Sequence, residues 1–417
     1  MSIVVAGAVV TKDVLSGVLV AGKPVVIKKK LIEAMNNNKK NKVVILGNDH
    51  TNSLGVAQCM GKSGFEVVPF VWGMKSGMLR HSRYVSKIFT GKDAQACIDM
   101  MLQFFSSEEE KIPVIACCDT AALTLEKNKE RLKHRFLFEY STNYTLDYLA
   151  EKAHQVKLAK ESGFNVPSTW LLVSVDELPK DIVYPCLIKP LVSSQGAKSD
   201  IRICNTEEEL RDNFRNLDYT KRVLLQQYIE RDYEISILGC GTKTGDVIIP
   251  CVENKLTLYP KNVGLECLAN MQPLEDKDII NPIRSLIKSF GYVGVFSIEM
   301  MHCRLDGKFY FTEANLRNDG ANSFVYKYGV NLPFVHVCDL QEKTLPEYNE
   351  THPGFYIWEM HHLSSLLHRD ICFWQWLKEI KKSKGFLTYF CDDRIPFYWQ
   401  FISPILRKLH LTERGMY

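Results

Sequence analysis

Hydrophobic positions follow one pattern over residues 42–150 and another over residues 151–341. In the first stretch, continuous apolar runs such as 42–47 and 65–72 alternate with segments of helical periodicity. Apolar runs without alternation are typical of strands buried on both faces, and strands separated by helices favour a parallel sheet. We therefore predict that residues 42–150 form a doubly wound, parallel α/β domain.

The second stretch consists of β-rich runs separated by turn signals such as Lys243-Thr244-Gly245, with few helical segments between them. Antiparallel strands with helices to one side are typical of an α+β domain, which we predict over residues 151–341. The flanking segments continue neither pattern. Residues 1–41 are predicted to be an extension or linker, and residues 342–417 an aromatic and basic C-terminal extension.

The stretch from Tyr292 to Arg317 contains two β-rich runs on either side of Asp306-Gly307, which predicts a hairpin. Its register decides which side chains face each other. A two-residue loop pairs residues whose numbers sum to 613 (306 + 307), which places Glu299 and Glu313 on opposite faces. A three-residue loop, Leu305-Asp306-Gly307 with Gly307 left-handed and a bulge, pairs numbers that sum to 612 (299 + 313). We expect the second register, in which the two glutamates face each other.

Two carboxylates at cross-strand distance repel each other, so this pairing calls for a neutralising cation. Mg²⁺ takes oxygen ligands and is commonly held by one or two carboxylates together with substrate phosphates. Asn315 and Arg317 follow Glu313 at strand spacing, so an amide oxygen and a guanidinium that can bind phosphate share that face. The alternative is a solvated hairpin with its charges outward, which the apolar Val295 and Met301 on the same face disfavour.

Composition narrows the classes of function. With 417 residues, 46% hydrophobic and 24% charged, the chain is typical of a soluble globular protein of two or three domains. A net charge of +4 is too small to indicate a nucleic-acid partner. Thirteen cysteines without a C-x-x-C pair favour reduced thiols in the cytoplasm over disulfides or structural zinc. No run approaches the length of a membrane span, and the N-terminus makes a poor signal peptide.

A small, flexible segment, VSSQGAKS (192–199), lies between two predicted strands. Its hydroxyls, backbone N–H groups and Gly196 suit a loop that covers phosphates, with Lys189 as a point charge at its base. By itself this pattern is also that of an ordinary hairpin tip. Its combination with Glu299, Glu313 and Arg317 favours a nucleotide site.

Taken together, these motifs resemble the ATP-grasp superfamily, in particular its carbamoyl-phosphate-synthase-like and D-aspartate-ligase-like carboxylate–amine ligases. The second acid fourteen residues upstream of the E-x-N-x-R motif (Glu313 to Arg317; 313 − 299) is specific to this pattern. The resemblance covers about residues 151–341, which it implies to be an ATP-grasp domain of two α+β subdomains. The preceding α/β domain looks like the family's usual N-terminal partner.

The resemblance also implies a role for each matching residue. The set comprises the ATP-contacting lysines Lys152 and Lys189, the loop residues Ser193, Ser194 and Gly196, the adenine- and ribose-binding Gln226, Gln227, Tyr228, Ile229 and Glu234, the magnesium ligands Glu299, Glu313 and Asn315, and Arg317 beside the transferred phosphoryl group. Gln227 departs from the glutamate that many members carry there. Lys189 and Arg317 are expected to act in the reaction itself.

The implied reaction activates a carboxylate with ATP as an acyl phosphate, which an amine then attacks to give an amide. ATP and Mg²⁺, or Mn²⁺, are the implied cofactors, and a small carboxylate and an amine are the implied partners. Two alternatives stay open: bicarbonate activation, as in carboxylases or carbamoyl-phosphate synthesis, and a non-catalytic ATP-binding regulator. The first is weakened because the sequence shows no biotin-carrier segment or glutaminase-like triad. The second is weakened because a pure binder has no need of Arg317.

Residues 342–417 hold four of the chain's six tryptophans and a lysine cluster at 378–384. Packing on the ligase core or against a homodimer partner is favoured over peripheral contact with the inner membrane face, because aromatic residues dominate cores and interfaces. Lys255 and Lys261 either neutralise an acidic co-substrate or are solvated lysines on a loop. His361 and His368 share a helical face, where a packed helix is favoured over a metal site.

Overall fold

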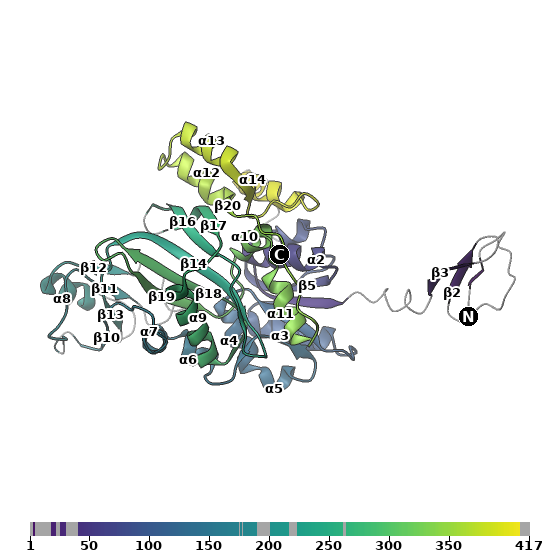
Figure 1. Ribbon diagram of the computed structural model, residues 1–417, viewed down its shortest axis with the longest axis horizontal. Helices are drawn as coiled ribbons and strands as arrows, with labels where there is room; N and C mark the ends of the chain where they lie inside the picture. Colours follow the sequence, from purple (N-terminus) through teal and green to yellow (C-terminus); the bar gives the residue numbers. More distant parts are fainter. Residues whose placement is uncertain are drawn as a thin grey trace.

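The computed structural model describes residues 3–4, 18–21, 26–30, 41–174, 176, 178–189, 201–216, 223–261 and 264–408. These residues form four β-sheets with helices packed around the three larger ones (Figure 1). The smallest sheet lies near the N-terminus and has the order β1-β2-β3, from β1 (Ile3–Val4), β2 (Val18–Ala21) and β3 (Val26–Lys30).

Five strands form the parallel sheet that the apolar runs predicted. In spatial order they are β6 (Phe89–Thr90), β5 (Glu66–Lys75), β4 (Lys42–Asp49), β7 (Ile112–Ala116) and β8 (Phe136–Leu137), and all their pairings are parallel. Val44 and Leu46 pack in one hydrophobic cluster and Val43 and Ile45 in another, and all four are fully buried. Because β4 is covered on both faces, the prediction of a parallel α/β sheet is confirmed.

Short helices connect and cover these strands. They are α2 (Thr51–Lys62), the 3₁₀ helix η1 (Leu79–His81), α3 (Ala94–Phe104), α4 (Asp119–Lys127) and α5 (Lys129–Leu132). Helix α4 follows the carboxyl end of β7, so its first residue, Asp119, lies at the edge of the sheet where ligands of open α/β sheets usually bind.

A four-stranded antiparallel sheet, named here the Lys189 sheet, contains the residue that the sequence placed beside the phosphates. Its order is β10 (Thr169–Leu172), β13 (Val223–Gln227), β11 (Cys186–Lys189) and β12 (Arg202–Cys204), and α8 (Glu207–Arg215) follows β12. Lys189 is the last residue of β11. The predicted phosphate loop residues Ser193, Ser194 and Gly196 lie outside the described residues.

The largest sheet has nine strands. Its main order is β19 (Phe309–Asn315), β18 (Tyr292–Cys303), β14 (Arg231–Gly241), β16 (Val252–Tyr259), β17 (Leu265–Gln272), β20 (Gly354–Ile357) and β21 (Ser383–Phe386), while β15 (Val247–Ile248) pairs with β14 and β9 (Tyr140–Ser141) with β18. One face is apolar: Ile235, Ile237 and Ile298 pack in the same cluster as Ile283 and Leu286 of α9 (Lys277–Phe290). Other helices near this sheet include α6 (Leu146–Ala150), α7 (Lys152–Glu161), α10 (Asn322–Tyr328) and α11 (Leu332–Leu340).

The β18–β19 hairpin has the expected pairing at its centre, because Glu299 lies directly opposite Glu313. The predicted three-residue loop is wrong. Cys303 N donates to Lys308 O (2.8 Å), which closes a four-residue loop and sets a register of 611 (303 + 308) next to the turn. That register would place Glu299 opposite Thr312 (299 + 312 = 611). A bulge at Thr312 restores the 612 register beyond it.

The turn itself behaves in part as predicted. Gly307 has φ +69° in the left-handed region, where glycine carries no steric penalty, and its N–H donates to Cys303 O (3.0 Å). The prediction that Glu299 and Glu313 lie opposite each other was therefore right. The pairing arises from the bulge at Thr312, however, and not from a three-residue loop.

The C-terminal extension packs on the core, as the favoured interpretation held. Strand β20 pairs with β17, and α12 (Glu359–Leu367) packs on β16 and β17. The last helices are α13 (Phe373–Lys382) and α14 (Ile395–Lys408), of which α14 contacts η1 of the parallel-sheet region. Among the described residues, no helix is long and apolar enough to cross a membrane.

Candidate active site

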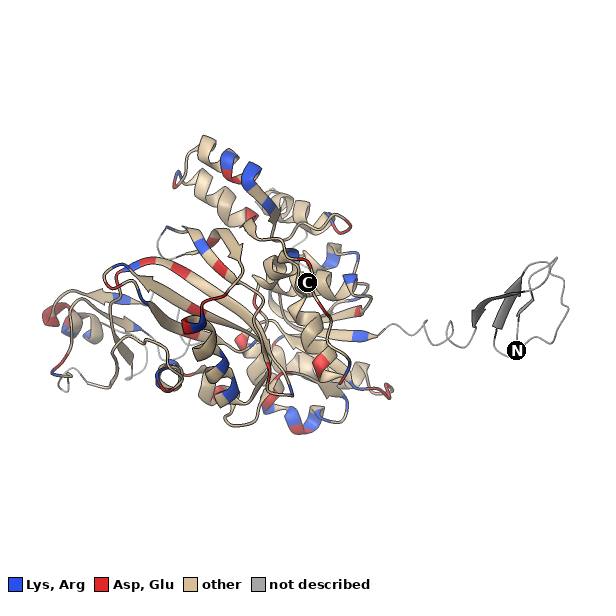
Figure 2. Ribbon diagram, in the orientation of Figure 1, with Lys and Arg blue, Asp and Glu red and all other residues tan. Residues whose placement is uncertain are grey.

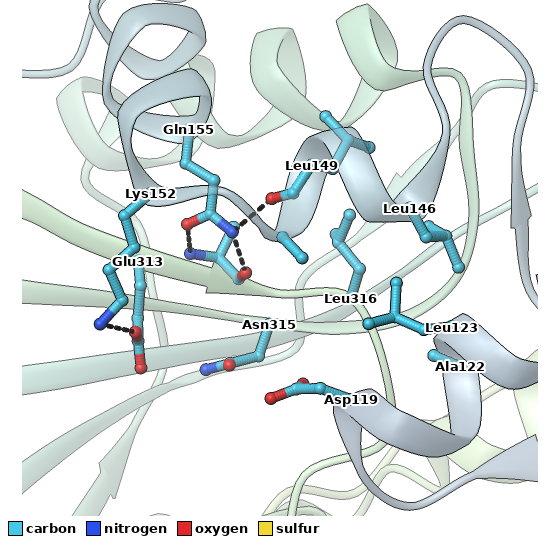
Figure 3. Close-up of a pocket in the computed structure, with 12 residues that line it drawn as sticks. Asp119, Ala122, Leu123, Leu146, Leu149, Lys152, Gln155, Glu313, Asn315 and Leu316 are labelled. Atoms are coloured by element: carbon cyan, nitrogen blue, oxygen red, sulfur yellow. Dashed lines mark hydrogen bonds and ion pairs between the residues drawn. The ribbon is translucent and has the colours of Figure 1, made fainter. Parts of the chain in front are cut away.

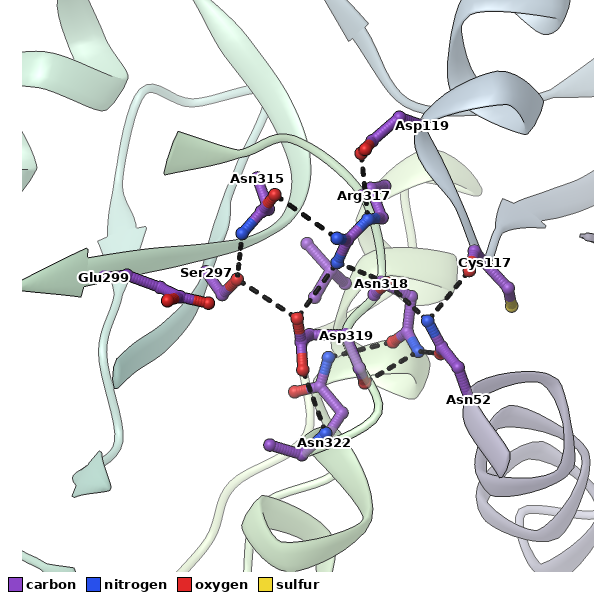
Figure 4. Close-up of polar contacts among 12 residues, drawn as sticks. Asn52, Cys117, Asp119, Ser297, Glu299, Asn315, Arg317, Asn318, Asp319 and Asn322 are labelled. Atoms are coloured by element: carbon purple, nitrogen blue, oxygen red, sulfur yellow. Dashed lines mark hydrogen bonds and ion pairs between the residues drawn. The ribbon is translucent and has the colours of Figure 1, made fainter. Parts of the chain in front are cut away.

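The site lies on the face of the nine-stranded sheet opposite the α9 cluster. Glu299 and Glu313 face each other there. Two residues along the strands, Ser297 lies opposite Asn315 (Figure 4). The side chains of Glu299 and Glu313 are 28% and 23% exposed, so they are half-buried but accessible. The face that the sequence predicted to be functional therefore carries opposed carboxylates at partly shielded positions.

Glu313 is surrounded by positive charge from two other elements. Lys152 Nζ, at the start of α7, lies 3.3 Å from Glu313 Oε2 (Figure 3). Burial alone would raise the pKa of Glu313, but the charges of Lys152 and Lys189 outweigh it and lower the pKa below the ordinary value. Burial lowers the pKa of Lys189 to about 7, and repulsion from Lys152 adds to the effect. The Lys189 sheet thus supplies a desolvated ammonium that an anion such as phosphate would stabilise in its charged form.

Glu299 has a different partner. Lys255 Nζ, on β16, lies 3.4 Å from Glu299 Oε2, and the lysine side chain is only 9% exposed. Burial raises the pKa of Glu299, and repulsion from Glu313 adds to this although Lys255 opposes it. The sequence left the role of Lys255 open, and the structure places it in the site, whereas Lys261 is exposed. Lys255 lies opposite Glu234 of β14, a strand pairing that only the structure reveals.

Arg317 is held on three sides. Its Nε donates to Asp119 Oδ1 (3.0 Å), Nη1 to Asp319 Oδ2 (2.9 Å) and Nη2 to Asn315 Oδ1 (3.2 Å) (Figure 4). Burial would lower the pKa of Arg317, but the two aspartates raise it further above its ordinary value. The guanidinium is therefore charged and fixed in direction beside the two facing carboxylates. Sequence reasoning missed both aspartates, and Asp119 gave no signal because it lies at the start of α4, far from Arg317 in the sequence.

A clamp that the sequence did not reveal fixes the strand between the two metal-ligand candidates on β19. Gln155 of α7 is buried; its Oε1 accepts from Ala314 N (3.0 Å) and its Nε2 donates to Ala314 O (2.9 Å) (Figure 3). Ala314 separates Glu313 from Asn315, so Gln155 fixes the backbone from which both side chains project. Beside it, a cavity of about 40 Å³ reaches from Lys152 and Glu313 to Asp119.

The predicted adenine segment runs from the end of β13 towards β14. Gln226 and Ile229 are buried, and Gln226 Nε2 donates to Thr169 Oγ1 (2.9 Å). Gln227 Oε1 accepts from Ser168 N (3.3 Å), and Tyr228 N donates to Pro185 O (3.1 Å). Glu234 is ion-paired with Arg231. These contacts place the segment at the junction between the Lys189 sheet and the nine-stranded sheet.

A magnesium ion fits the donors on this face. Glu299, Glu313 and Asn315 offer two carboxylates and an amide oxygen, the hard ligands that Mg²⁺ prefers. Within the described part of the chain, no three His, Cys, Asp or Glu side chains cluster in a way that could hold a metal by themselves. Three histidines of the extension are bonded elsewhere: His361 to Glu266 O (3.1 Å), His362 to Glu379 (2.6 Å) and His368 to Ser364 O (2.9 Å).

Opposed carboxylates, lysines from separate sheets and an anchored arginine form a site suited to phosphoryl transfer, a reaction that depends on positioning and charge stabilisation. Residues 157–323 match the family described as the ATP-grasp domain. The resemblance inferred from the sequence is therefore confirmed for this part of the chain, which matches an ATP-grasp domain.

Known proteins similar to this chain include ligases and carboxylases. It is 22% identical over 316 residues to the D-aspartate ligase of Enterococcus faecium (strain Aus0004), which covers 69% of this chain and 74% of that enzyme. It is 31% identical over 189 residues to the 2-oxoglutarate carboxylase small subunit of Hydrogenobacter thermophilus (strain DSM 6534 / IAM 12695 / TK-6), over 41% of this chain and 39% of that subunit. The crystal structure of N5-carboxyaminoimidazole synthetase from Staphylococcus aureus aligns with a TM-score of 0.60 and 14% identity, over 76% of this chain and 81% of that one. This last match shows a common fold.

Proposed function

We propose that the protein is an ATP- and Mg²⁺-dependent, ADP-forming ligase that joins a carboxylate to an amine. The observation that carries the proposal is the facing of Glu299 and Glu313 beside the anchored Arg317. A site that only binds ATP needs charges for the phosphates, but it gains nothing from a bidentate cation fixed beyond them. The match of residues 157–323 to the ATP-grasp domain and the similarity to a D-aspartate ligase support the same conclusion.

The roles follow from where the charges lie. Lys189 and Lys152 attract the phosphates of ATP, and the segment Gln226–Ile229 together with Glu234 contacts the adenosine. Arg317 holds the acceptor carboxylate and the γ-phosphate oxygens, while charge spreads between them as the phosphoryl group moves. The acceptor oxygen forms the new P–O bond, ADP leaves, and the amine then displaces phosphate from the acyl carbon.

Glu299, Glu313 and Asn315 would hold the Mg²⁺, which would neutralise negative charge that develops during phosphoryl transfer. The chain's own contribution is to keep these donors in register. The bulge at Thr312 places Glu299 and Glu313 opposite each other, and Gln155 fixes the backbone between Glu313 and Asn315.

The main rival is activation of bicarbonate, since one relative is a carboxylase subunit. A crossed screen of ADP release separates the two, with carboxylates in one dimension and amines or bicarbonate in the other. We expect release that needs both a carboxylate and an amine, and that Glu313→Gln abolishes. Release with bicarbonate alone would overturn the ligase proposal in favour of the rival. Nucleotide binding without release in any combination would favour a regulatory protein.

Further proposals concern the setting of the enzyme. All thirteen cysteines are free thiols and most are buried, which supports a cytoplasmic location. We also propose the division into residues 1–41, 42–150, 151–341 and 342–417 as an extension, an N-terminal domain, an ATP-grasp domain and a C-terminal extension. A homodimer contact through residues 342–417 is a proposal that light scattering tests. The observations give no support for membrane contact.

A further inference from the structure

Glu253 is a buried carboxylate on the face of the candidate site. It lies on β16 two positions before Lys255, so both side chains belong to the same face, and Ser236 lies opposite it on β14. The residue is 1% exposed. Neither Oε1 nor Oε2 has a hydrogen-bond partner among the described residues.

An unpartnered carboxylate in such a place is costly, because an ion that loses its hydration needs a counter-charge and hydrogen-bond donors. Most of the charges near Glu253 are negative. Burial raises the pKa of Glu253, repulsion from Glu266 adds to it, and Asp319 and Glu299 act in the same direction while Lys255 opposes them. Lys255 is itself engaged 3.4 Å from Glu299. Without a bound cation the fold therefore favours the neutral acid at Glu253, whose two oxygens have no hydrogen-bond partner among the described residues.

The residues around Glu253 restrict the kind of ligand that can supply a positive charge and hydrogen-bond donors. An anion such as bicarbonate would be repelled by the carboxylates. A divalent cation needs several ligands converging on one point, and no three acidic, histidine or cysteine side chains converge in this way within the described ranges. A primary ammonium needs only a carboxylate or two and brings three N–H donors of its own.

From this geometry we infer that Glu253 binds the ammonium group of the amine substrate. The inference rests on the proposed ligase function and names the subsite for its second substrate. The position suits that role, because Asp319, whose charge acts on Glu253, accepts a hydrogen bond from Arg317 Nη1 (2.9 Å). The amine is thus held on the same face as the arginine that contacts the activated carboxylate. Because an ammonium has no lone pair, it gives one proton to the Glu253 carboxylate before its nitrogen attacks the acyl carbon and displaces phosphate.

The first test measures binding without catalysis. Thermal unfolding of the protein with Mg²⁺ and ADP is followed while ethylammonium chloride is added, with tetramethylammonium chloride as a cation that lacks N–H donors. We expect ethylammonium to raise Tm beyond the effect of tetramethylammonium, and E253Q to remove the difference. Glu139→Gln is the matched control, because Glu139 is also a buried glutamate with an unpartnered oxygen, and it should respond like the wild type.

The second test separates this subsite from the first half-reaction. Hydroxylamine, which is largely uncharged at neutral pH, traps an acyl phosphate as a hydroxamate without needing an ammonium site. With a carboxylate found in the screen, E253Q should keep hydroxamate formation while the KM for the amine rises about 10- to 100-fold, as expected for loss of a hydrogen bond to a charged group. Glu253→Met, of similar size and without charge, should behave in the same way if the amide variant does not fold.

The outcomes distinguish the two proposals. Equal Tm shifts in the wild type and E253Q, or no ethylammonium shift in the wild type, would overturn the ammonium subsite. An unchanged KM for the amine in a folded E253Q protein would do the same. A specific ammonium shift without any hydroxamate or ADP release would instead remove the ligase function and leave the cation site standing.

Discussion

The parallel sheet and the nine-stranded sheet differ in the side chains on their faces. The parallel sheet is apolar on both faces, whereas the nine-stranded sheet is apolar on one face and carries the polar residues of the site on the other. In the parallel sheet, Val43 and Ile45 point to one apolar cluster and Val44 and Leu46 to another, so the strand interiors serve only stability. In the nine-stranded sheet, Ile298 faces the α9 cluster, while its neighbours Ser297 and Glu299 carry the polar face. Charges inside a sheet are expensive, so their presence on one face marks the place where ligands bind.

The two sheets also contribute to the site from different places. The nine-stranded sheet presents side chains from the middle of its strands, where register fixes them. The parallel sheet contributes from the end of a strand, through Asp119 after β7, which holds Arg317. A stable apolar scaffold thus orients a reactive group that the other sheet carries.

The largest effect should come from the polar face. Replacing Glu313 by Gln should lower kcat by more than about 10³-fold while appreciable ATP affinity remains, because a metal ligand acts most on charge that develops during transfer. Lys189→Ala should instead weaken ATP binding, since that charge meets phosphate in the ground state as well. ADP release and nucleotide titration measure the two effects, and small, equal losses in both variants would contradict these roles.

Arg317 tests whether the geometry of the cation matters beyond its charge. We expect Arg317→Lys to reduce kcat by about 10²–10³, because a point charge cannot replace a planar fork that bridges two oxygens. ATP affinity should change little. Near-full turnover, or a parallel collapse of ATP affinity, would show that Arg317 acts in the ground state or only in folding.

A substitution in the core of the parallel sheet should lower the stability of the protein and leave kcat nearly unchanged. Ile45 is fully buried, so Ile45→Ala should lower the free energy of unfolding by about 2–5 kcal/mol through lost burial and an unfilled cavity. Urea unfolding measures this, and kcat per folded molecule should stay near the wild-type value. A large fall in kcat with unchanged stability would contradict the view that the interior of the parallel sheet serves only stability.

Asp119, at the end of the parallel sheet, connects that sheet to the site on the nine-stranded sheet through its bond to Arg317. Asp119→Asn keeps an acceptor for Arg317 Nε but removes a charge, so the guanidinium should be less firmly oriented and kcat should fall by about tenfold. The measurement is kcat for ADP release with ATP saturating. Glu126→Gln, on the same helix but facing α6, is the control and should leave kcat unchanged.

The smallest effect concerns pH. With its pKa lowered to about 7, Lys189 in the folded state releases its proton at a lower pH than in the unfolded chain. Above that pH the unfolded chain binds more protons, so the free energy of unfolding should rise by up to about 1.4 kcal/mol per pH unit between about pH 7 and 8.5. Lys189→Gln should lose this part of the slope. Urea unfolding of protein free of metal and nucleotide tests it, and identical slopes in both proteins would show that Lys189 is solvated.

Local patterns were enough for much of the fold. Apolar runs fixed the parallel sheet, since only strands covered on both faces can bury them, and the spacing of Glu299, Glu313, Asn315 and Arg317 placed them on one face. The pairing of the two glutamates was predicted correctly from a loop that turned out wrong. A four-residue loop and a bulge at Thr312 give the same pairing, and the sequence around a turn does not distinguish them.

By itself the sequence determined the central strands of the parallel sheet and the β18–β19 hairpin, the residues that share a face of that hairpin and the chemistry that the face supports, because these follow from short-range periodicity and residue type. Only the tertiary structure decided which charges meet. Asp119 lies 198 residues before Arg317, Gln155 clamps a strand 159 residues away, and Lys255 reaches Glu299 across a neighbouring strand. Such contacts depend on the order of strands in a sheet and on how helices pack beside it. The burial that makes Glu253 a site is likewise a property of the assembled fold, absent from any one segment.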